Sequence, residues 1–114
     1  MNNSGALAEQ LAAQYLQRQG LKPLKANYRC PFGEIDLIMQ DGETCVFAEV
    51  RLRSQTTFGG AAASIDARKQ AKLIRTAQHY LATLKHIPPC RFDAVLMQST
   101  DIKQIEWIKN AFTI

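Results

Sequence analysis

The pair Asp41-Gly42, set between two short apolar runs, is the feature that most constrains how this chain folds. The runs cover residues 33–38 and 46–51. An Asp-Gly pair flanked by strand-like runs is among the strongest sequence signals for a β-hairpin. We therefore expect an antiparallel pair of strands near the centre of the chain.

A turn made by Asp41 and Gly42 themselves sets Asp36 opposite Phe47, and Glu34 opposite Glu49. Because side chains alternate along a strand, each face of the hairpin can be listed. One face carries Glu34, Asp36, Phe47, Glu49 and Arg51, and the other carries Ile35, Leu37, Val46, Ala48 and Val50. The first face is charged at its open end, and the second is apolar throughout.

Asp36 and Glu49 are diagonal neighbours in this register, ~7–8 Å apart by sheet geometry. Two carboxylates at that distance can converge on one hard cation such as Mg²⁺, with waters and phosphate oxygens as further ligands. The alternative is a solvated or edge-protecting acidic face, which is a common use of charged residues on strands. The spacing alone leaves both interpretations open.

A length of 114 residues indicates a single domain, 1–114. No apolar run approaches the ~20 residues that span a bilayer, and the first residues lack the pattern of a signal peptide. The three cysteines, Cys30, Cys45 and Cys90, show no zinc-ligand spacing. We therefore expect a cytoplasmic protein with no membrane association. The net charge of +4 is compatible with a polyanionic partner.

The remaining pattern completes an order α-β-β-β-α-β-β. Apolar periodicity and turn signals predict helices at 4–19 and 66–85, strands at 21–30, 33–38, 44–51, 91–98 and 102–108, and a loop at 52–63. The strand 44–51, helix 66–85 and strand 91–98 form a βαβ unit, which requires a parallel pair. The fold class is therefore α/β, a mixed sheet with a helix packed on it from each half of the chain.

The second helix carries two separate stripes. The apolar stripe is Leu73, Ala77, Tyr80, Leu81 and Leu84, and the basic stripe is Arg68, Lys72, Arg75 and His79. The basic stripe is either a solvated face or a surface for a phosphate backbone. Its closeness in sequence to the acidic hairpin favours the second interpretation.

These residues together resemble a known family. The matching positions are 5–9, 11–12, 27–29, 33–38, 47–51, 53, 58–59, 63, 69–81 and 92–93. They are similar to the YraN-like bacterial proteins and, more broadly, to the PD-(D/E)XK nuclease superfamily, which includes Holliday-junction resolvases.

The resemblance implies a restriction-endonuclease-like fold in which Asp36 and Glu49 hold Mg²⁺ or Mn²⁺. It also implies that Glu9, on the first helix, lies near that metal, and that Gln70 belongs to the functional part of the second helix. The alternatives are an ordinary exposed helix acid for Glu9 and a surface residue for Gln70. Most superfamily members carry Lys two residues after the Glu, where this chain has Arg51. Arg cannot act as a general base, although it can bind a phosphate.

The sequence therefore leads to a hypothesis of weak metal-dependent endonuclease activity on DNA, including branched DNA, with Asp36, Glu49, Arg51 and Glu9 as the catalytic set. The residues expected to contact nucleic acid are Arg53, Arg68, Lys69, Gln70, Lys72 and Arg75. We also expect a homodimer, by analogy with resolvases. The alternative function is an inactive nucleic-acid-binding or partner-recruiting module of the same fold.

Overall fold

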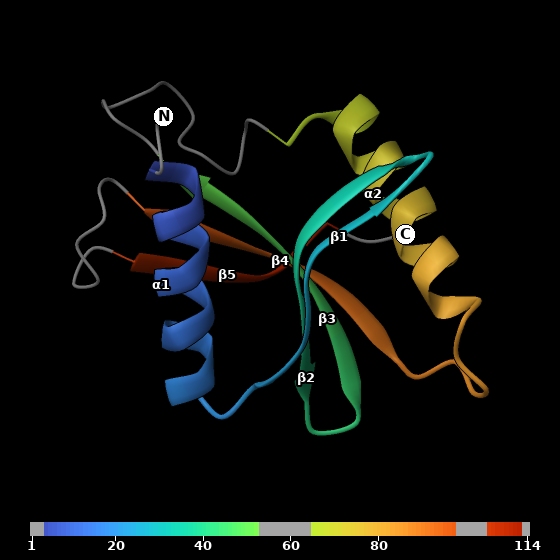
Figure 1. The fold of residues 1–114 in the computed structure, drawn as a ribbon, viewed down its shortest axis with the longest axis horizontal. Helices are drawn as coiled ribbons and strands as arrows, with labels where there is room; N and C mark the ends of the chain where they lie inside the picture. Colours follow the sequence, from blue (N-terminus) through green and yellow to red (C-terminus); the bar gives the residue numbers. More distant parts are fainter. Residues whose placement is uncertain (1–3, 53–64, 98–104, 113–114) are drawn as a thin grey trace.

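A computed structural model describes residues 4–52, 65–97 and 105–112. Its elements are α1 (Ser4–Arg18), β1 (Lys22–Cys30), β2 (Gly33–Asp41), β3 (Thr44–Leu52), α2 (Ala67–Leu81), β4 (Cys90–Met97) and β5 (Ile105–Phe112) (Figure 1). The predicted order α-β-β-β-α-β-β is confirmed. The predicted loop 52–63 lies almost wholly outside the described residues.

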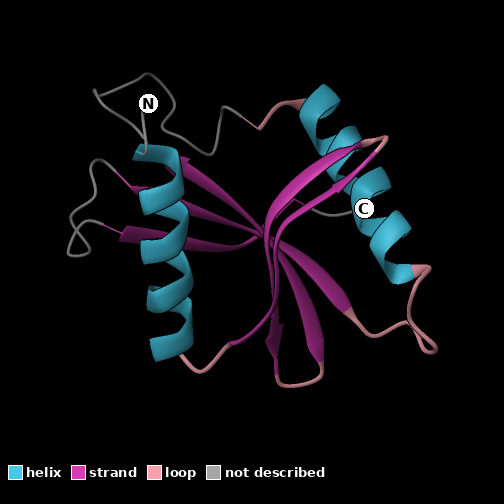
Figure 2. Ribbon diagram, in the orientation of Figure 1, coloured by secondary structure: helices cyan, strands magenta, loops and turns pink. Residues whose placement is uncertain are grey.

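The five strands form one mixed sheet in the order β1-β2-β3-β4-β5. The β3–β4 pair is parallel, as the βαβ unit requires, and the other pairs are antiparallel. The two helices cover opposite faces of the sheet (Figure 2). Each helix closes its own apolar core, with Leu16 of α1 in one and Leu73 of α2 in the other.

Local signals explain the end of α1 and the start of α2. Gly20, with φ +100°, follows α1, and the Leu21 amide reaches back 3.0 Å to the carbonyl of Leu16. This is the left-handed glycine stop of a Schellman motif. Asp66 caps α2 by accepting a hydrogen bond of 2.9 Å from the Lys69 amide.

Two predicted boundaries were wrong. The helix α2 ends at Leu81 rather than at residue 85, so Leu84 packs against the core from beyond the helix. The last strand, β5 (Ile105–Phe112), ends at Phe112 rather than at residue 108, and its predicted first residues, 102–104, lie outside the described residues. Tertiary packing decides such ends, because β5 is held by its pairing with β4 rather than by its own sequence.

The predicted hairpin register was also wrong by two residues. Asp41 pairs with Thr44, so the turn consists of Gly42 and Glu43, and Phe47 lies opposite Ile38. An ion pair of 2.8 Å between Asp41 and Arg91 of β4 fixes Asp41 at the end of its strand. Because the shift is an even number of residues, the faces of β3 are those that the sequence predicts.

The predicted faces of β2 hold only in part, because this strand changes direction at Asp36. Ile35 packs in the α2 core whereas Leu37 packs in the α1 core, although regular alternation would set them on one face. On the neighbouring strand, Asn27 adopts a left-handed φ of 53°. The β2–β3 ladder ends at Leu37, and the strand continues beside α2 with β1 alone. The two strands of the central hairpin therefore separate at Asp36.

Candidate active site

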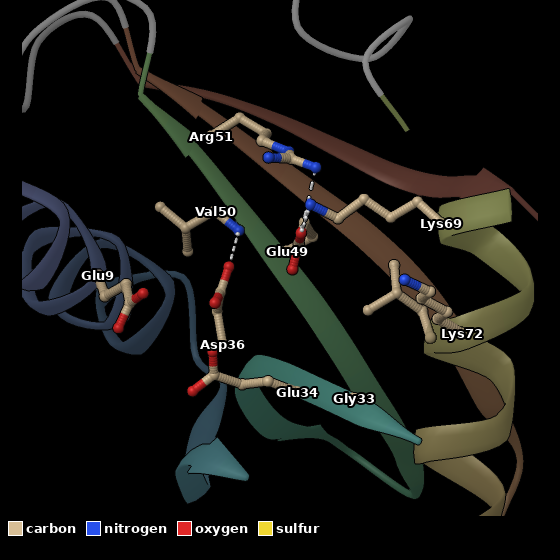
Figure 3. A pocket seen from close by; sticks show the side chains of 10 residues that line it. Glu9, Gly33, Glu34, Asp36, Glu49, Val50, Arg51, Lys69 and Lys72 are labelled. Atoms are coloured by element: carbon tan, nitrogen blue, oxygen red, sulfur yellow. Dashed lines mark hydrogen bonds and ion pairs between the residues drawn. The ribbon is translucent and has the colours of Figure 1, made fainter. Parts of the chain in front are cut away.

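A pocket of about 350 Å³ lies where β2 leaves β3. It is bounded by α1 on one side and by the first turns of α2 on the other (Figure 3). Its lining consists of Glu9, Gly33, Glu34, Asp36, Glu49, Val50, Arg51, Lys69, Lys72 and Leu73. The pocket thus combines carboxylates from two strands and one helix with basic side chains from β3 and α2.

The Asp36 carboxylate accepts a hydrogen bond from a backbone amide of β3 that lies outside the β2–β3 pairing. Val50 lies beyond the last paired position of β2 and β3, and its amide donates to Asp36 Oδ2 at 2.8 Å. Burial, and after it the neighbouring charge of Glu49, raise the pKa of Asp36 to about 8. The Val50 amide acts against this rise, and Glu9 contributes to it more weakly. The charge of Glu49 thus disfavours the ionised form of Asp36 in this small space.

Glu49 is 7% exposed, and two cations from different elements compensate its charge. Lys69 Nζ lies 2.8 Å from Glu49 Oε2, and Arg51 Nη2 lies 3.4 Å from the same oxygen (Figure 3). The buried Nε atom of Arg51 has no hydrogen-bond partner among the described residues. A buried donor without a partner is costly in free energy, so this Nε–H is available to an acceptor that enters the pocket.

The structure brings together most, but not all, of the predicted site residues. Glu9, Asp36, Glu49, Arg51, Lys69 and Lys72 line the pocket. Arg68 and Arg75 lie on α2 and do not line it. Gln70 instead donates from its amide to the carbonyl of Ile65 at 2.9 Å, which is a structural contact at the start of α2. Arg53 lies outside the described residues.

The sequence did not predict that Lys69 contacts Glu49. It set Lys69 with the residues that contact a phosphate backbone, whereas the structure places its ammonium group on a carboxylate. The signal was present in Asp66, whose cap puts Lys69 in the first turn of the helix, one turn before Lys72. The acceptor role of Asp36 toward the Val50 amide was not predicted either, because it depends on where the strands separate.

The donor set suits a hard divalent cation held by few protein ligands. Asp36 and Glu49 supply oxygen atoms, and Mg²⁺ is commonly held by one or two carboxylates with waters and substrate oxygens. Among residues 4–52, 65–97 and 105–112, no group of three or more His, Cys, Asp or Glu side chains could enclose a metal ion. Two carboxylates would leave most of the coordination sphere of such a cation to waters and to oxygen atoms from another molecule.

The fold and the pocket define a small α/β protein with an acidic site at a split in its sheet. The chain belongs to the uncharacterised protein family UPF0102, whose model matches residues 8–97. A family member from Nitrosomonas europaea is 61% identical over 110 residues, covering 96% of this chain and 93% of the relative. One from Methylobacillus flagellatus is 56% identical over 114 residues, covering 99% of each. None of the described helices is long and apolar enough to cross a membrane.

Proposed function

We propose that this protein hydrolyses phosphodiester bonds in DNA with Mg²⁺ or Mn²⁺ bound by Asp36 and Glu49. One observation carries the proposal: the carboxylates of Asp36 and Glu49 line one pocket together with basic side chains from β3 and α2. A carboxylate with a perturbed pKa in a cleft, as Asp36 has here, is typical of functional sites.

The two carboxylates are held on rigid elements. Glu49 lies in the central strand β3, between its neighbours β2 and β4, and the Val50 amide fixes the orientation of Asp36. A bound divalent cation would lower the pKa of a water ligand and polarise the scissile phosphate. Glu9, on the α1 side of the pocket, would accept a hydrogen bond from a water ligand there.

The basic residues of the pocket would neutralise the phosphate. The Arg51 Nε–H, which has no partner among the described residues, would donate to a phosphate oxygen. Lys69 would remain beside Glu49, and Lys72 would hold the adjoining backbone phosphate. Since Arg51 cannot accept a proton, these interactions supply charge stabilisation rather than general-base catalysis, and we expect a low rate.

The ion pairs of Glu49 also favour a second candidate, a nucleic-acid-binding module without catalysis. Lys69 and Arg51 already compensate the charge of Glu49, which weakens its demand for a metal ion. Such a module would bind DNA without cleaving it, whatever divalent cation is added.

Cleavage assays separate the two candidates. Purified protein would be incubated with labelled duplex, single-stranded and four-way-junction DNA, in Mg²⁺, in Mn²⁺ and in EDTA. The proposal requires slow cleavage that depends on the metal and is abolished in Asp36→Asn and Glu49→Gln. Glu34→Gln is the matched control, since Glu34 lines the same pocket but its carboxylate pairs with Arg29 at 2.7 Å.

Two outcomes would overturn the proposal. Cleavage that survives both Asp36→Asn and Glu49→Gln would come from a contaminant or another site. DNA binding without cleavage of any substrate in either metal would establish the binding module instead.

A further inference from the structure

Phe32, in the turn between β1 and β2, is a large aromatic side chain that the fold leaves 47% exposed. The hairpin carrying it runs beyond the rest of the sheet and ends beside α2 (Figure 1). Apolar side chains at a two-residue turn are unusual, because small and polar residues fill such turns more readily. The folding of the hairpin does not by itself require an aromatic side chain at this exposed position.

The turn is held firmly against α2. Gly33 has a φ of 154°, and a Cβ there would lie 3.1 Å from Thr76 Oγ1, which itself donates to the carbonyl of Lys72 at 2.8 Å. The Phe32 ring meets His79 edge-on, with 6.2 Å between ring centroids. His79 in turn is fixed by a 2.6 Å hydrogen bond with the hydroxyl of Tyr28. The exposed ring is thus a pre-organised surface rather than a freely moving one.

The surroundings of the ring are basic and adjoin the candidate active site. The Arg75 guanidinium lies over the ring, 6.0 Å from its centroid, and the exposed Arg29, on the strand that precedes the turn, pairs with Glu34. Gly33, the next residue after Phe32, lines the pocket, as does Lys72. A polyanion that leaves the pocket along this hairpin would pass over the ring.

We propose that Phe32 is a stacking platform for an unpaired base of single-stranded DNA next to the phosphate bound in the pocket. Exposed aromatic rings combined with basic side chains are how proteins hold single strands, because every base offers a π-face. A paired base in a continuous duplex cannot present that face. This inference rests on the proposed function for its ligand, and it assigns a substrate class to it: DNA with unpaired nucleotides, as in single strands.

Binding in EDTA tests the inference without any cleavage. The probes are a single-stranded oligonucleotide carrying 2-aminopurine and the same sequence as a blunt duplex, followed by fluorescence anisotropy and 2-aminopurine quenching. We expect wild type to prefer the single strand and to quench the probe. Phe32→Ala should weaken affinity for the single strand by about 5- to 150-fold, the range typical of alanine substitution at stacking residues. Its affinity for the duplex should change little.

Two variants separate stacking from packing. Phe32→Leu keeps an apolar side chain against α2 but has no π-face, so it should bind as weakly as Phe32→Ala does. Phe32→Trp should restore both binding and quenching. Leu24→Ala, at an exposed apolar residue within β1, is the control for reduced surface area and should bind as wild type. Thermal unfolding by circular dichroism identifies any variant that fails to fold.

The inference is overturned if Phe32→Leu binds the single strand as wild type does, if the affinities for duplex and single strand fall equally, or if wild type binds neither. Its failure and that of the proposed function are distinguishable. Cleavage that needs Asp36 but is indifferent to Phe32 would leave the nuclease proposal standing. Stacking without cleavage would support the base-stacking role of Phe32 and contradict the nuclease proposal.

Discussion

At the scale of single residues, Asp36 should make stability depend on pH in an unusual direction. Its pKa is about 8 in the folded chain against an ordinary 3.8. Between those values the folded state holds a proton that the unfolded state has released, so the free energy of unfolding falls as pH rises from about 4 to about 8. The effect is on the order of a few kcal/mol.

Asp36→Asn should remove this dependence, because an amide can still accept from the Val50 N–H and can donate to Glu49. We expect the variant to be more stable than wild type at pH 8–9, and close to it at pH 4, in the absence of metal. Urea unfolding at a series of pH values measures the difference. A difference that is the same at pH 4 and pH 9 would contradict the assignment, and Glu34→Gln should show none of it.

The same carboxyl group should couple metal binding to proton release. A divalent cation binds the ionised pair, so its apparent affinity should rise about tenfold per pH unit up to about pH 8 and then level off. Calorimetric titration of Mn²⁺ at pH 6, 7, 8 and 9 tests this expectation. In Asp36→Asn the affinity should be low at every pH, and a flat profile in wild type would contradict the proposed site.

Arg51→Lys should raise the rate of cleavage. Both side chains are cationic, but only lysine can lose a proton and assist a water molecule, and general-base assistance is typically worth ~10²–10⁴-fold. Single-turnover assays in Mg²⁺ and Mn²⁺ would compare wild type, Arg51→Lys and the double variant that adds Asp36→Asn. Equal rates for wild type and Arg51→Lys would show that Arg51 is not what limits the reaction.

At the scale of elements, the basic face of α2 should supply affinity without sequence preference. Replacing Arg68, Lys72 and Arg75 together by Ala should weaken DNA binding and lower the salt slope by about 0.9 for each duplex phosphate that is no longer neutralised. Anisotropy titrations at several salt concentrations measure both. The control removes equal charge elsewhere, at the exposed Arg18, Lys22 and Lys25, and binding unchanged by the α2 substitutions would contradict the prediction.

The sequence predicted the elements well and the split in the sheet not at all. Asp41-Gly42, the apolar stripe of α2 and the βαβ pattern are local signals, and each element they indicate is present. At the end of the hairpin, Asp41 forms an ion pair with Arg91, a residue far away in the sequence. Interactions of this kind have no periodicity to reveal them.

The candidate site was predictable where it depends on strand faces. Glu49 and Arg51 share one face of β3, as alternation requires, and both line the pocket. The position of Asp36 follows from the bend of β2, and the Lys69–Glu49 ion pair follows from how α2 docks on the sheet. Both are consequences of tertiary packing, so the sequence supplied the residues of the pocket but not their pairing.

At the scale of the whole molecule, the number of chains on the substrate remains a prediction. The proposed metal ligands form one pair, Asp36 and Glu49, so a single chain would act on one phosphate at a time. A branched DNA with two-fold symmetry offers two equivalent phosphates, which suits a closed two-fold dimer. Light scattering should therefore detect two chains on a four-way junction, and a monomer mass both free and DNA-bound would contradict this expectation.

The separation of β2 from β3 has a consequence for how the protein could be made more stable. If β2 and β3 formed one more hydrogen-bonded pair of residues beyond Leu37, the Val50 amide would find its partner within the sheet. Asp36 would then no longer be held by its hydrogen bond with that amide. The added pair would also bring the strands together across the space that the pocket occupies. A continuous sheet and the pocket would therefore use the same backbone amide, that of Val50, in two incompatible ways. Selection for a sturdier sheet would act against the pocket, as happens where stability and activity compete for one part of a fold.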